Sequence, residues 1–297
     1  MSINQLNKPL SFVDMQRHMT QILRDAGCEN AALDARLLLT HIADMTDEQL
    51  ALSFEAPIPP GLERVVQRVI AMRAAGKPVA KIIGHKEFWG RLFRVSEAVL
   101  DPRPDSETLI EAALPLLPQK QNLQLIDLGT GSGCLLLTLL AEREMARGLG
   151  IDKSRAALYI ARLNAHRLDV RNRVAFRHGD WLVGEAVWAD MIVANPPYLE
   201  SAEIAGLGKA VRLYDPLGAL DGGADGLTPY RRLIAPAFAR LKNGGHLILE
   251  IGPTKAAAVT RLMIEAGFEE ILLRQDLAGR DRILLGQKNA RKNKKGV

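Results

Sequence analysis

One short stretch constrains the fold more than any other, because it places a glycine-rich loop between a buried strand and a helix. Residues 123–128 have the length of a strand and are mainly apolar, and Gly129-Thr130-Gly131-Ser132-Gly133 follows directly. Residues 134–140 then have the apolar pattern of a helix. Glycines let the backbone approach a ligand closely, and the first turn of a helix presents free N–H groups. This order is typical of a nucleotide-binding crevice in an α/β protein.

Strand and helix patterns continue to alternate along the rest of the chain. Further strands are expected at residues 148–152, 174–177, 191–194, 246–251, 271–274 and 283–286, and further helices at 154–168, 230–242 and 255–266. A polar, glycine-rich loop is expected from Glu200 to Thr228, and a turn at Asn243-Gly244-Gly245. Such alternation predicts a Rossmann-like α/β domain, with a mostly parallel sheet and helices on both faces. Asp152, Trp181 and Asn195 each follow a strand, so we expect them to meet the glycine loop at the carboxyl edge of the sheet.

Asp152 ends its strand 21 residues beyond Gly131. An acidic residue at this place in a nucleotide-binding fold can bind both hydroxyls of a ribose. The alternative interpretation is that Asp152 caps the helix that begins at Ser154. The two interpretations are compatible.

The N-terminal region has a different character, because its apolar residues recur only at helical spacing. Helices are expected from Ser11 to Ala26 and at residues 30–43, 47–52 and 62–75. Residues 1–76 are therefore predicted to form a helical bundle that recognises a protein substrate. The remaining expected parts are a linker with a β-hairpin (77–100), the catalytic domain (101–287) and a disordered basic tail (288–297).

The composition is that of a soluble protein, with 47% hydrophobic and 25% charged residues among 297. No apolar run is long enough to span a bilayer, and the first residues lack a signal-peptide pattern. Cys28 and Cys134 are far apart and the histidines show no ligand spacing, so neither a disulfide nor a metal is expected. We expect a cytoplasmic monomer that does not associate with membranes.

The charge pattern argues against a nucleic-acid substrate. The net charge is +5, and five lysines and arginines lie within residues 288–297, so the rest of the chain is balanced. The tail can add weak contact with RNA, but the body offers no basic surface for following a phosphate backbone.

The strand at residues 191–194 ends in Asn195-Pro196-Pro197-Tyr198. Neither proline can donate to a strand ladder, and each favours an extended conformation in the residue before it. The Asn195 side chain and the carbonyls of Asn195 and Pro196 therefore remain available, beside the ring of Tyr198. Such a group suits the binding of a planar NH₂-bearing group, whose hydrogens the oxygens accept. The alternative is a simple turn formed by an asparagine and two prolines.

These motifs resemble those of class I S-adenosylmethionine-dependent methyltransferases that modify planar nitrogens. Over nearly its whole length the chain is more specifically similar to the protein-(glutamine-N5) methyltransferase family, in the branch that modifies peptide chain release factors. The segments that carry this closer resemblance are Glu87-Phe88-Trp89, Pro102-Arg103-Pro104-Asp105-Ser106-Glu107, Ala219-Leu220-Asp221-Gly222-Gly223, Glu250-Ile251-Gly252 and Asp276-Leu277-Ala278-Gly279-Arg280-Asp281. One departure is Asp101, where the family usually has an apolar residue before Pro-Arg-Pro.

The residues after Asp101 allow alternative interpretations. Asp105 or Ser106 can cap the helix expected at residues 108–116. Arg103 lies between two prolines and is either a surface-loop charge, which the sequence alone slightly favours, or a positioned site residue.

The resemblance implies S-adenosyl-L-methionine as the cofactor. In the family pattern, the loop from Gly129 to Gly133 holds its methionine part, Asp152 binds its ribose, and Asp180-Trp181 flank its adenine. Asn195 also borders the cofactor.

The resemblance also implies the substrate, which is the glutamine of the Gly-Gly-Gln motif in class 1 release factors. Asn195 and the Pro196 carbonyl are expected to accept hydrogen bonds from the glutamine amide. Pro197 belongs to the same substrate-binding turn, and Tyr198 packs against the glutamine side chain. No residue stands out as a strong base, so the sequence does not identify the proton acceptor.

Three other functions fit part of the sequence. A DNA or RNA adenine or guanine N-methyltransferase would use the same tetrapeptide on a flipped base, but the neutral body and the aromatic content of 5% argue against it. A glutamine methyltransferase of a ribosomal protein remains open. A cofactor-binding scaffold without activity is disfavoured, because Asn195-Pro196-Pro197-Tyr198 is intact.

Overall fold

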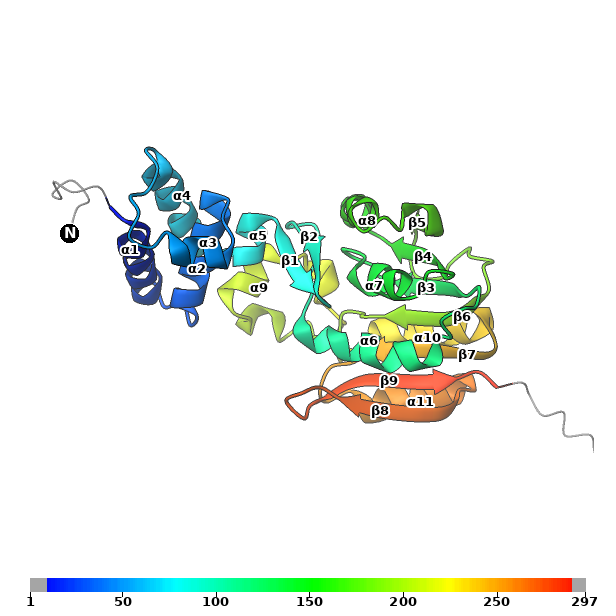
Figure 1. Ribbon diagram of the computed structural model, residues 1–297. Coiled ribbons are helices and arrows are strands. Elements are labelled where there is room, and N and C mark those ends of the chain that lie inside the picture. Colours follow the sequence, from blue (N-terminus) through cyan, green and yellow to red (C-terminus); the bar gives the residue numbers. More distant parts are fainter. Residues whose placement is uncertain (1–9, 290–297) are drawn as a thin grey trace, which may run out of the picture. The chain divides into compact units, whose positions relative to one another are not determined.

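A computed structural model describes residues 10–289, which fall into two compact units (Figure 1). The first contains the described residues up to Gly84 together with Lys209–Tyr214. The second contains His85–Gly208 and the described residues from Asp215 onward. Each unit has a hydrophobic core of its own.

The first unit is helical. Its elements are α1 (Phe12–Asp25), α2 (Ala31–Ala43), α3 (Asp47–Leu52), α4 (Leu62–Ala74), α5 (Val79–Ile83) and α9 (Lys209–Tyr214). Ser11 caps α1 as expected, since its hydroxyl accepts the Asp14 N–H at 3.3 Å. Leucine and methionine side chains on the inner faces of α1 and α2, such as Met19 and Leu38, are fully buried and form the core.

This unit extends beyond the expected boundary at Gly76. Helix α5 follows that glycine, and its apolar side chains pack against the core of the bundle. A helix of five residues is too short to show a hydrophobic period, so the sequence pattern did not indicate it. Helix α9 lies where a glycine-rich loop was expected. Tyr214, the last residue of α9, has its ring centroid 5.8 Å from the Nζ of Lys77.

The second unit is built on a seven-stranded sheet with the order β5-β4-β3-β6-β7-β9-β8. The strands are β3 (Gln124–Leu128), β4 (Arg147–Asp152), β5 (Val174–His178), β6 (Ala189–Ala194), β7 (Leu241–Glu250), β8 (Glu269–Gln275) and β9 (Asp281–Gln287). The first five pair in parallel, whereas β9 pairs antiparallel with β7 and β8. This confirms the predicted mostly parallel α/β fold.

Helices cover both faces of this sheet, as predicted (Figure 1). One face packs against α6 (Glu107–Ala113), α7 (Cys134–Glu142) and α8 (Arg155–Arg167), and the other against α10 (Thr228–Arg240) and α11 (Ala256–Ala266). Successive residues of β6 alternate between the two cores: Met191 and Val193 lie in one, Ile192 and Ala194 in the other. Burial on both faces explains why the strand is apolar without interruption from Met191 to Ala194.

A short hairpin precedes the sheet and confirms the expected one. It consists of β1 (His85–Phe88) and β2 (Arg91–Arg94), and its Phe88 and Phe93 rings are buried with an edge-to-face contact at 6.1 Å. The order of β1 and β2 places the turn at Trp89-Gly90, and both residues have a positive φ.

Two further details differ from the sequence interpretation. Asn243-Gly244-Gly245 was expected to form a turn, but these residues lie within β7, where the register against β6 shifts between Ala189 and Met191. The basic tail was expected to begin at Lys288, but the ammonium group of Lys288 donates to the carbonyls of Phe238 and Leu241 at 2.8 and 2.7 Å. Lys288 therefore belongs to the folded unit, and the tail from residue 290 lies outside the described residues.

Asn164 of α8 joins three parts of the second unit. Its side chain is fully buried, accepts the Arg94 N–H at 2.7 Å, and donates to the carbonyls of Arg94 and Ser132 at 3.0 and 2.8 Å. One carboxamide thus satisfies backbone groups of the hairpin and of the glycine loop.

We predict that Asn164→Ala lowers the free energy of unfolding of this unit by about 2–4 kcal/mol, because it leaves buried backbone groups unpaired. Denaturation by urea, followed by tryptophan fluorescence, measures this directly, since Trp89, Trp181 and Trp188 all lie in the second unit. The matched control is Asn172→Ala at an exposed position, for which we expect a change within about 0.5 kcal/mol. Equal midpoints for the two variants would contradict this account of Asn164.

Candidate active site

A cavity lies at the carboxyl edge of β3, β4 and β6. Its wall contains eight of the predicted site residues, namely Gly129, Thr130, Gly131, Ser132, Asp152, Trp181, Asn195 and Pro197. Two segments complete the wall: the approach to α6 from Ala98 to Ser106, and the turn that contains Pro216 and Gly218. The structure therefore brings together residues from most of the second unit.

The glycine loop is held open by hydrogen bonds to the neighbouring strand. The N–H groups of Gly129 and Thr130 donate to the Ile151 carbonyl at 2.8 and 3.0 Å. Gly129 and Gly131 have φ values of +72° and +55°, which favour glycine. A Cβ on Gly129 would lie 3.6 Å from the Trp181 ring, so this indole covers the loop.

Gly133 does not line this cavity, although it was expected to contact the cofactor. It is the N-terminal cap of α7 with a φ of +81°, and a Cβ at this position would lie 2.8 Å from Leu137. Gly133 therefore serves to start α7 where no side chain fits. The glycine pattern in the sequence does not distinguish this structural role from contact with a ligand.

Asp152 links the glycine loop to the start of α8. Its Oδ2 accepts the Gly131 N–H at 2.9 Å, and its Oδ1 accepts the Ser154 N–H at 2.8 Å. The cap of α8 itself is Ser154, whose hydroxyl accepts the Ala157 N–H at 3.1 Å. Because each carboxylate oxygen has a second lone pair, the half-buried Asp152 can still accept hydrogen bonds from ligand hydroxyls.

Asp127 of β3 holds the same loop in place through Thr130. The sequence did not indicate this role. Its side chain is buried, and its Oδ2 accepts the Thr130 hydroxyl proton at 2.6 Å. Burial raises the pKa of Asp127 to about 7, in spite of this hydrogen bond. The residue lies behind the cavity wall and fixes Thr130, which lines it.

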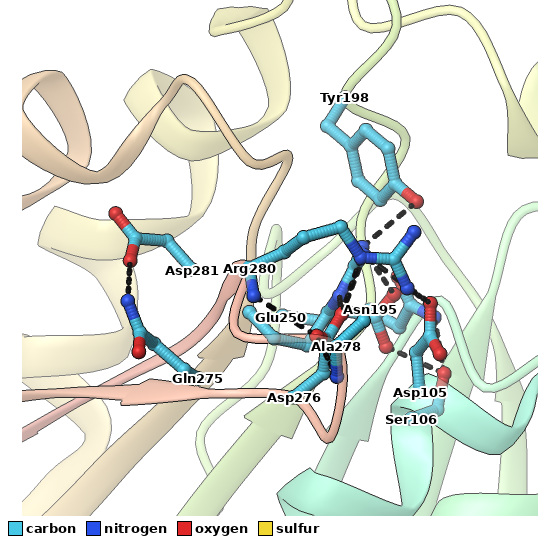
Figure 2. Close-up of polar contacts among 11 residues, drawn as sticks. Asp105, Ser106, Asn195, Tyr198, Glu250, Gln275, Asp276, Ala278, Arg280 and Asp281 are labelled. Carbon is cyan, nitrogen blue, oxygen red and sulfur yellow. Dashed lines mark hydrogen bonds and ion pairs between the residues drawn. The ribbon is translucent and has the colours of Figure 1, made fainter.

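Asn195 lies in the wall with its side chain anchored (Figure 2). Its Nδ2 donates to the Ser106 hydroxyl at 3.3 Å, and that hydroxyl donates to Glu250 Oε2 at 2.5 Å. Asp105 and Ser106 were the two alternative candidates for the cap of the following helix. Ser106 stands at the cap position of α6 but makes no cap hydrogen bond, because its hydroxyl is engaged with Glu250.

The other residues of the tetrapeptide have different environments. Pro197 lines the cavity, whereas Pro196 is buried and does not. Tyr198 also lies outside the wall, and its hydroxyl accepts a weak hydrogen bond from Arg282 Nη1 at 3.4 Å. Burial, together with the charge of Glu250, raises the pKa of Tyr198. Its expected contact with a substrate side chain stays a prediction.

Arg103 lines the cavity, although the sequence slightly favoured a surface-loop charge. Its Nη2 donates to the carboxylate of Asp215 at 2.8 Å, and the Asp215 side chain is only 2% exposed. The prolines on both sides of Arg103 restrict its backbone, and that was the signal for a positioned residue. Asp101, the departure from the family pattern, is buried in the same wall.

Metal-binding clusters and membrane-spanning helices are both absent from the part of the chain that the structure describes. Within residues 10–289, no cluster of three or more histidine, cysteine or acidic side chains has the arrangement of a metal site. None of the helices in that range is long and apolar enough to cross a membrane.

Solved structures with low sequence identity share the fold. A methyltransferase from Pyrococcus furiosus has a TM-score of 0.51 at 18% identity, over 75% of this chain and 98% of that one. A 16S rRNA methyltransferase from Thermus thermophilus has a TM-score of 0.51 at 21% identity, over 69% of this chain and 50% of that one. At these identities the likeness concerns the fold alone.

Two family models match the sequence. One, described as the PrmC N-terminal domain, matches residues 14–84, which nearly coincide with the helical unit. The other, described as the methyltransferase small domain, matches residues 104–210, which contain the glycine loop and Asn195.

Curated relatives match over nearly their whole length. The release factor glutamine methyltransferase of Cereibacter sphaeroides is 43% identical over 91% of this chain and 96% of its own. Those of Rhodospirillum rubrum and Caulobacter vibrioides are 42% and 40% identical over 90% of this chain, and over 82% and 93% of their own. The chain therefore belongs to the family of release factor glutamine methyltransferases.

Proposed function

We propose that this protein transfers a methyl group from S-adenosyl-L-methionine to the side-chain N5 of the glutamine in the Gly-Gly-Gln motif of class 1 peptide chain release factors. The observation that carries the proposal is the placement of the Asn195 carboxamide in the wall of the cavity that the glycine loop also lines. Family membership supports release factors as the substrate. The enzyme would act in translation termination.

The residues that line the cavity suit the cofactor in their donors, acceptors and apolar surface. The glycines at positions 129 and 131 leave backbone accessible where a side chain would intrude, which suits the methionine part. Asp152 offers carboxylate oxygens to ribose hydroxyls, and the Trp181 ring offers a flat apolar face to adenine. When bound, the cofactor supplies an electrophilic methyl group on a sulfonium.

The glutamine amide nitrogen is a poor nucleophile, and the protein has to compensate for its low reactivity. The lone pair of an amide nitrogen is delocalised into the carbonyl, so the nitrogen reacts only when it is aimed closely. Acceptor oxygens of Asn195 and Pro196 would hold the NH₂ group by its two hydrogens. As the nitrogen bonds to carbon it becomes more positive, so these acceptors stabilise the transition state more than the ground state. Tyr198 would pack beside the glutamine side chain.

The rest of the chain fits a protein substrate. The described residues of the helical unit include no metal-binding cluster of histidine, cysteine or acidic side chains, and we propose that this unit binds the release factor away from the reacting glutamine. The balanced charge of the body disfavours DNA or RNA as the substrate. We propose a cytoplasmic monomer, and the names of the relatives favour release factors over a ribosomal protein.

The substrate assignment is tested by mass spectrometry after incubation of the purified protein with S-adenosyl-L-methionine and a class 1 release factor. We expect one added methyl group, located on the glutamine of the Gly-Gly-Gln motif. A release factor with that glutamine changed to alanine is the control and should gain none. If the release factor stays unmodified while a ribosomal protein, DNA or RNA from the same organism is methylated, the assignment is wrong.

Cofactor binding is tested at Asp152. We predict that Asp152→Ala weakens S-adenosyl-L-methionine binding by about 1.5–3 kcal/mol, because the ribose hydroxyls lose a charged acceptor. Isothermal titration calorimetry gives the affinity. Asp152→Asn keeps one acceptor oxygen and should lose less, and Asp169→Asn at an exposed position should bind as the wild type does. An unchanged affinity of Asp152→Ala would remove this residue from the site.

A further inference from the structure

A chain of three side chains reaches from the cavity wall into the core of the second unit (Figure 2). Asn195 follows β6, Ser106 ends the short helical turn Pro104–Ser106, and Glu250 is the last residue of β7. Ser106 and Glu250 are each only 2% exposed, so water does not compete for their hydrogen bonds. The function proposed above gives no role to Ser106 or Glu250.

The direction of the hydrogen bonds fixes which end of the Asn195 amide faces the cavity. A serine hydroxyl has one proton, and here that proton is donated to Glu250 Oε2 at 2.5 Å. Toward Asn195 the Ser106 oxygen can therefore only accept, so the group that faces it must be the NH₂ of the carboxamide. Oδ1 consequently points away from Ser106.

This constraint matters because the two ends of a carboxamide are almost the same in shape. Without a partner that accepts but does not donate, the amide of Asn195 could rotate by half a turn at little cost. The rotated form would present an NH₂ group to the NH₂ group of a substrate amide, and two donors do not bond to each other. The acceptor needed for catalysis would be lost.

We propose that Ser106 and Glu250 are positioning residues, which hold the Asn195 carboxamide with Oδ1 as the acceptor for the hydrogens of the substrate amide. The inference rests on the proposed role of Asn195 in binding that amide. Glu250 does not line the cavity, and Ser106, which does, acts in this proposal through its hydrogen bond with Asn195.

Glu250 is itself held in place. The Tyr230 hydroxyl donates to its backbone carbonyl at 2.9 Å, and Arg282 Nη1 lies 4.0 Å from Oε1. Arg282 is 4% exposed and also pairs with Asp276 and Asp105, each at 3.2 Å. The buried carboxylate thus has a charged partner, and that partner is fixed by two further carboxylates.

The arrangement makes the orientation of Asn195 sensitive to pH. Burial raises the pKa of Glu250 to about 7, although the Ser106 hydrogen bond and the charge of Arg282 act in the opposite direction. Protonated Glu250 can donate to Ser106, and the hydroxyl proton of Ser106 then becomes available to Asn195 Oδ1. The rotated amide is satisfied in that state. Groups that face Glu250 from the surrounding elements are Asp105, Ser106, Cys134, Asn195, Tyr198, Tyr230 and Arg282, and the Asn195 side chain also lowers the pKa of Glu250.

The sign of the effect follows from the raised pKa. Above about pH 7 Glu250 is ionised and Asn195 is held in the productive orientation, and as the pH falls through about 7 the protonated fraction grows. Turnover should therefore have an acidic limb with its midpoint near the pKa of Glu250. Asp127, which fixes Thr130 in the cofactor loop, has a pKa in the same range, so any pH dependence that it gives to cofactor binding should persist in Glu250→Gln, whereas the limb in kcat should not.

The test compares kcat, KM for the release factor and cofactor affinity between about pH 6 and pH 9. We expect Ser106→Ala to lower kcat by about 10- to 100-fold with unchanged cofactor affinity, because the acceptor for the Asn195 NH₂ is gone. Ser106→Thr keeps the hydroxyl and should recover most of the turnover. Glu250→Gln can both accept from and donate to Ser106, so it should lower kcat above pH 7 and abolish the acidic limb. Glu265→Gln, exposed on α11, is the charge-matched control and should keep the wild-type profile.

Asn195→Ala in the same assay separates the two proposals. If Asn195→Ala turns over normally, the role of the tetrapeptide in substrate binding is wrong. If Asn195→Ala is slow but Glu250→Gln keeps both the wild-type kcat and the acidic limb, the positioning role is overturned and the function stands. If Ser106→Ala does not fold, as judged by its thermal midpoint, the pH profile of Glu250→Gln decides by the same criterion.

Discussion

The parallel pairing of β3 with β4 on one side and β6 on the other determines where the chemistry takes place. Leu128 is level with Ile151 in β4 and with Ala194 in β6. The next residues along the chain are Gly129 after β3, Asp152 at the end of β4 and Asn195 after β6, so all three lie at the same height at this edge of the sheet. A crevice forms at this edge because adjacent strands continue in different directions beyond it. The glycine loop, the acidic residue and the asparagine are far apart in sequence and meet only through this register.

Buried residues behind the crevice hold the side chains that line it in a fixed orientation. Asp127 fixes Thr130, and Glu250 acts on Asn195 through Ser106. Burying such carboxyl groups is unfavourable unless they are hydrogen-bonded or paired, and here each has a hydroxyl partner. Both carboxyl groups have a pKa raised to about 7 by burial, so their charge states change within the physiological range.

Much of the fold follows from local sequence patterns. The apolar run of β6, the glycine loop before α7 and the cap at Ser11 were each predictable, because hydrophobic period, positive φ and capping act within a few residues. The meeting of Gly129, Asp152 and Asn195 was predictable as well, because each follows a parallel strand. The short helix α5 was not, since five residues carry no period.

The sequence could not reveal contacts that depend on the topology. Ser106 is suited to cap a helix, and its actual partner Glu250 is 144 residues away. Arg103 was interpreted as a surface charge because Asp215, its partner, is 112 residues away in the chain. Gly133 and Tyr198 belong to the sequence motifs, yet both lie outside the cavity wall. Gly133 packs against Leu137 of α7, and the hydroxyl of Tyr198 accepts a hydrogen bond from Arg282.

The most direct test of the account is a crystal structure of this protein with S-adenosylhomocysteine and a class 1 release factor. The account predicts that the glutamine nitrogen lies about 3 Å from Asn195 Oδ1, while Nδ2 keeps its contact with Ser106. It also predicts that this nitrogen faces the sulfur of the cofactor product. A complex in which the glutamine amide lies elsewhere, or in which the Asn195 side chain has left Ser106, would contradict the central claim.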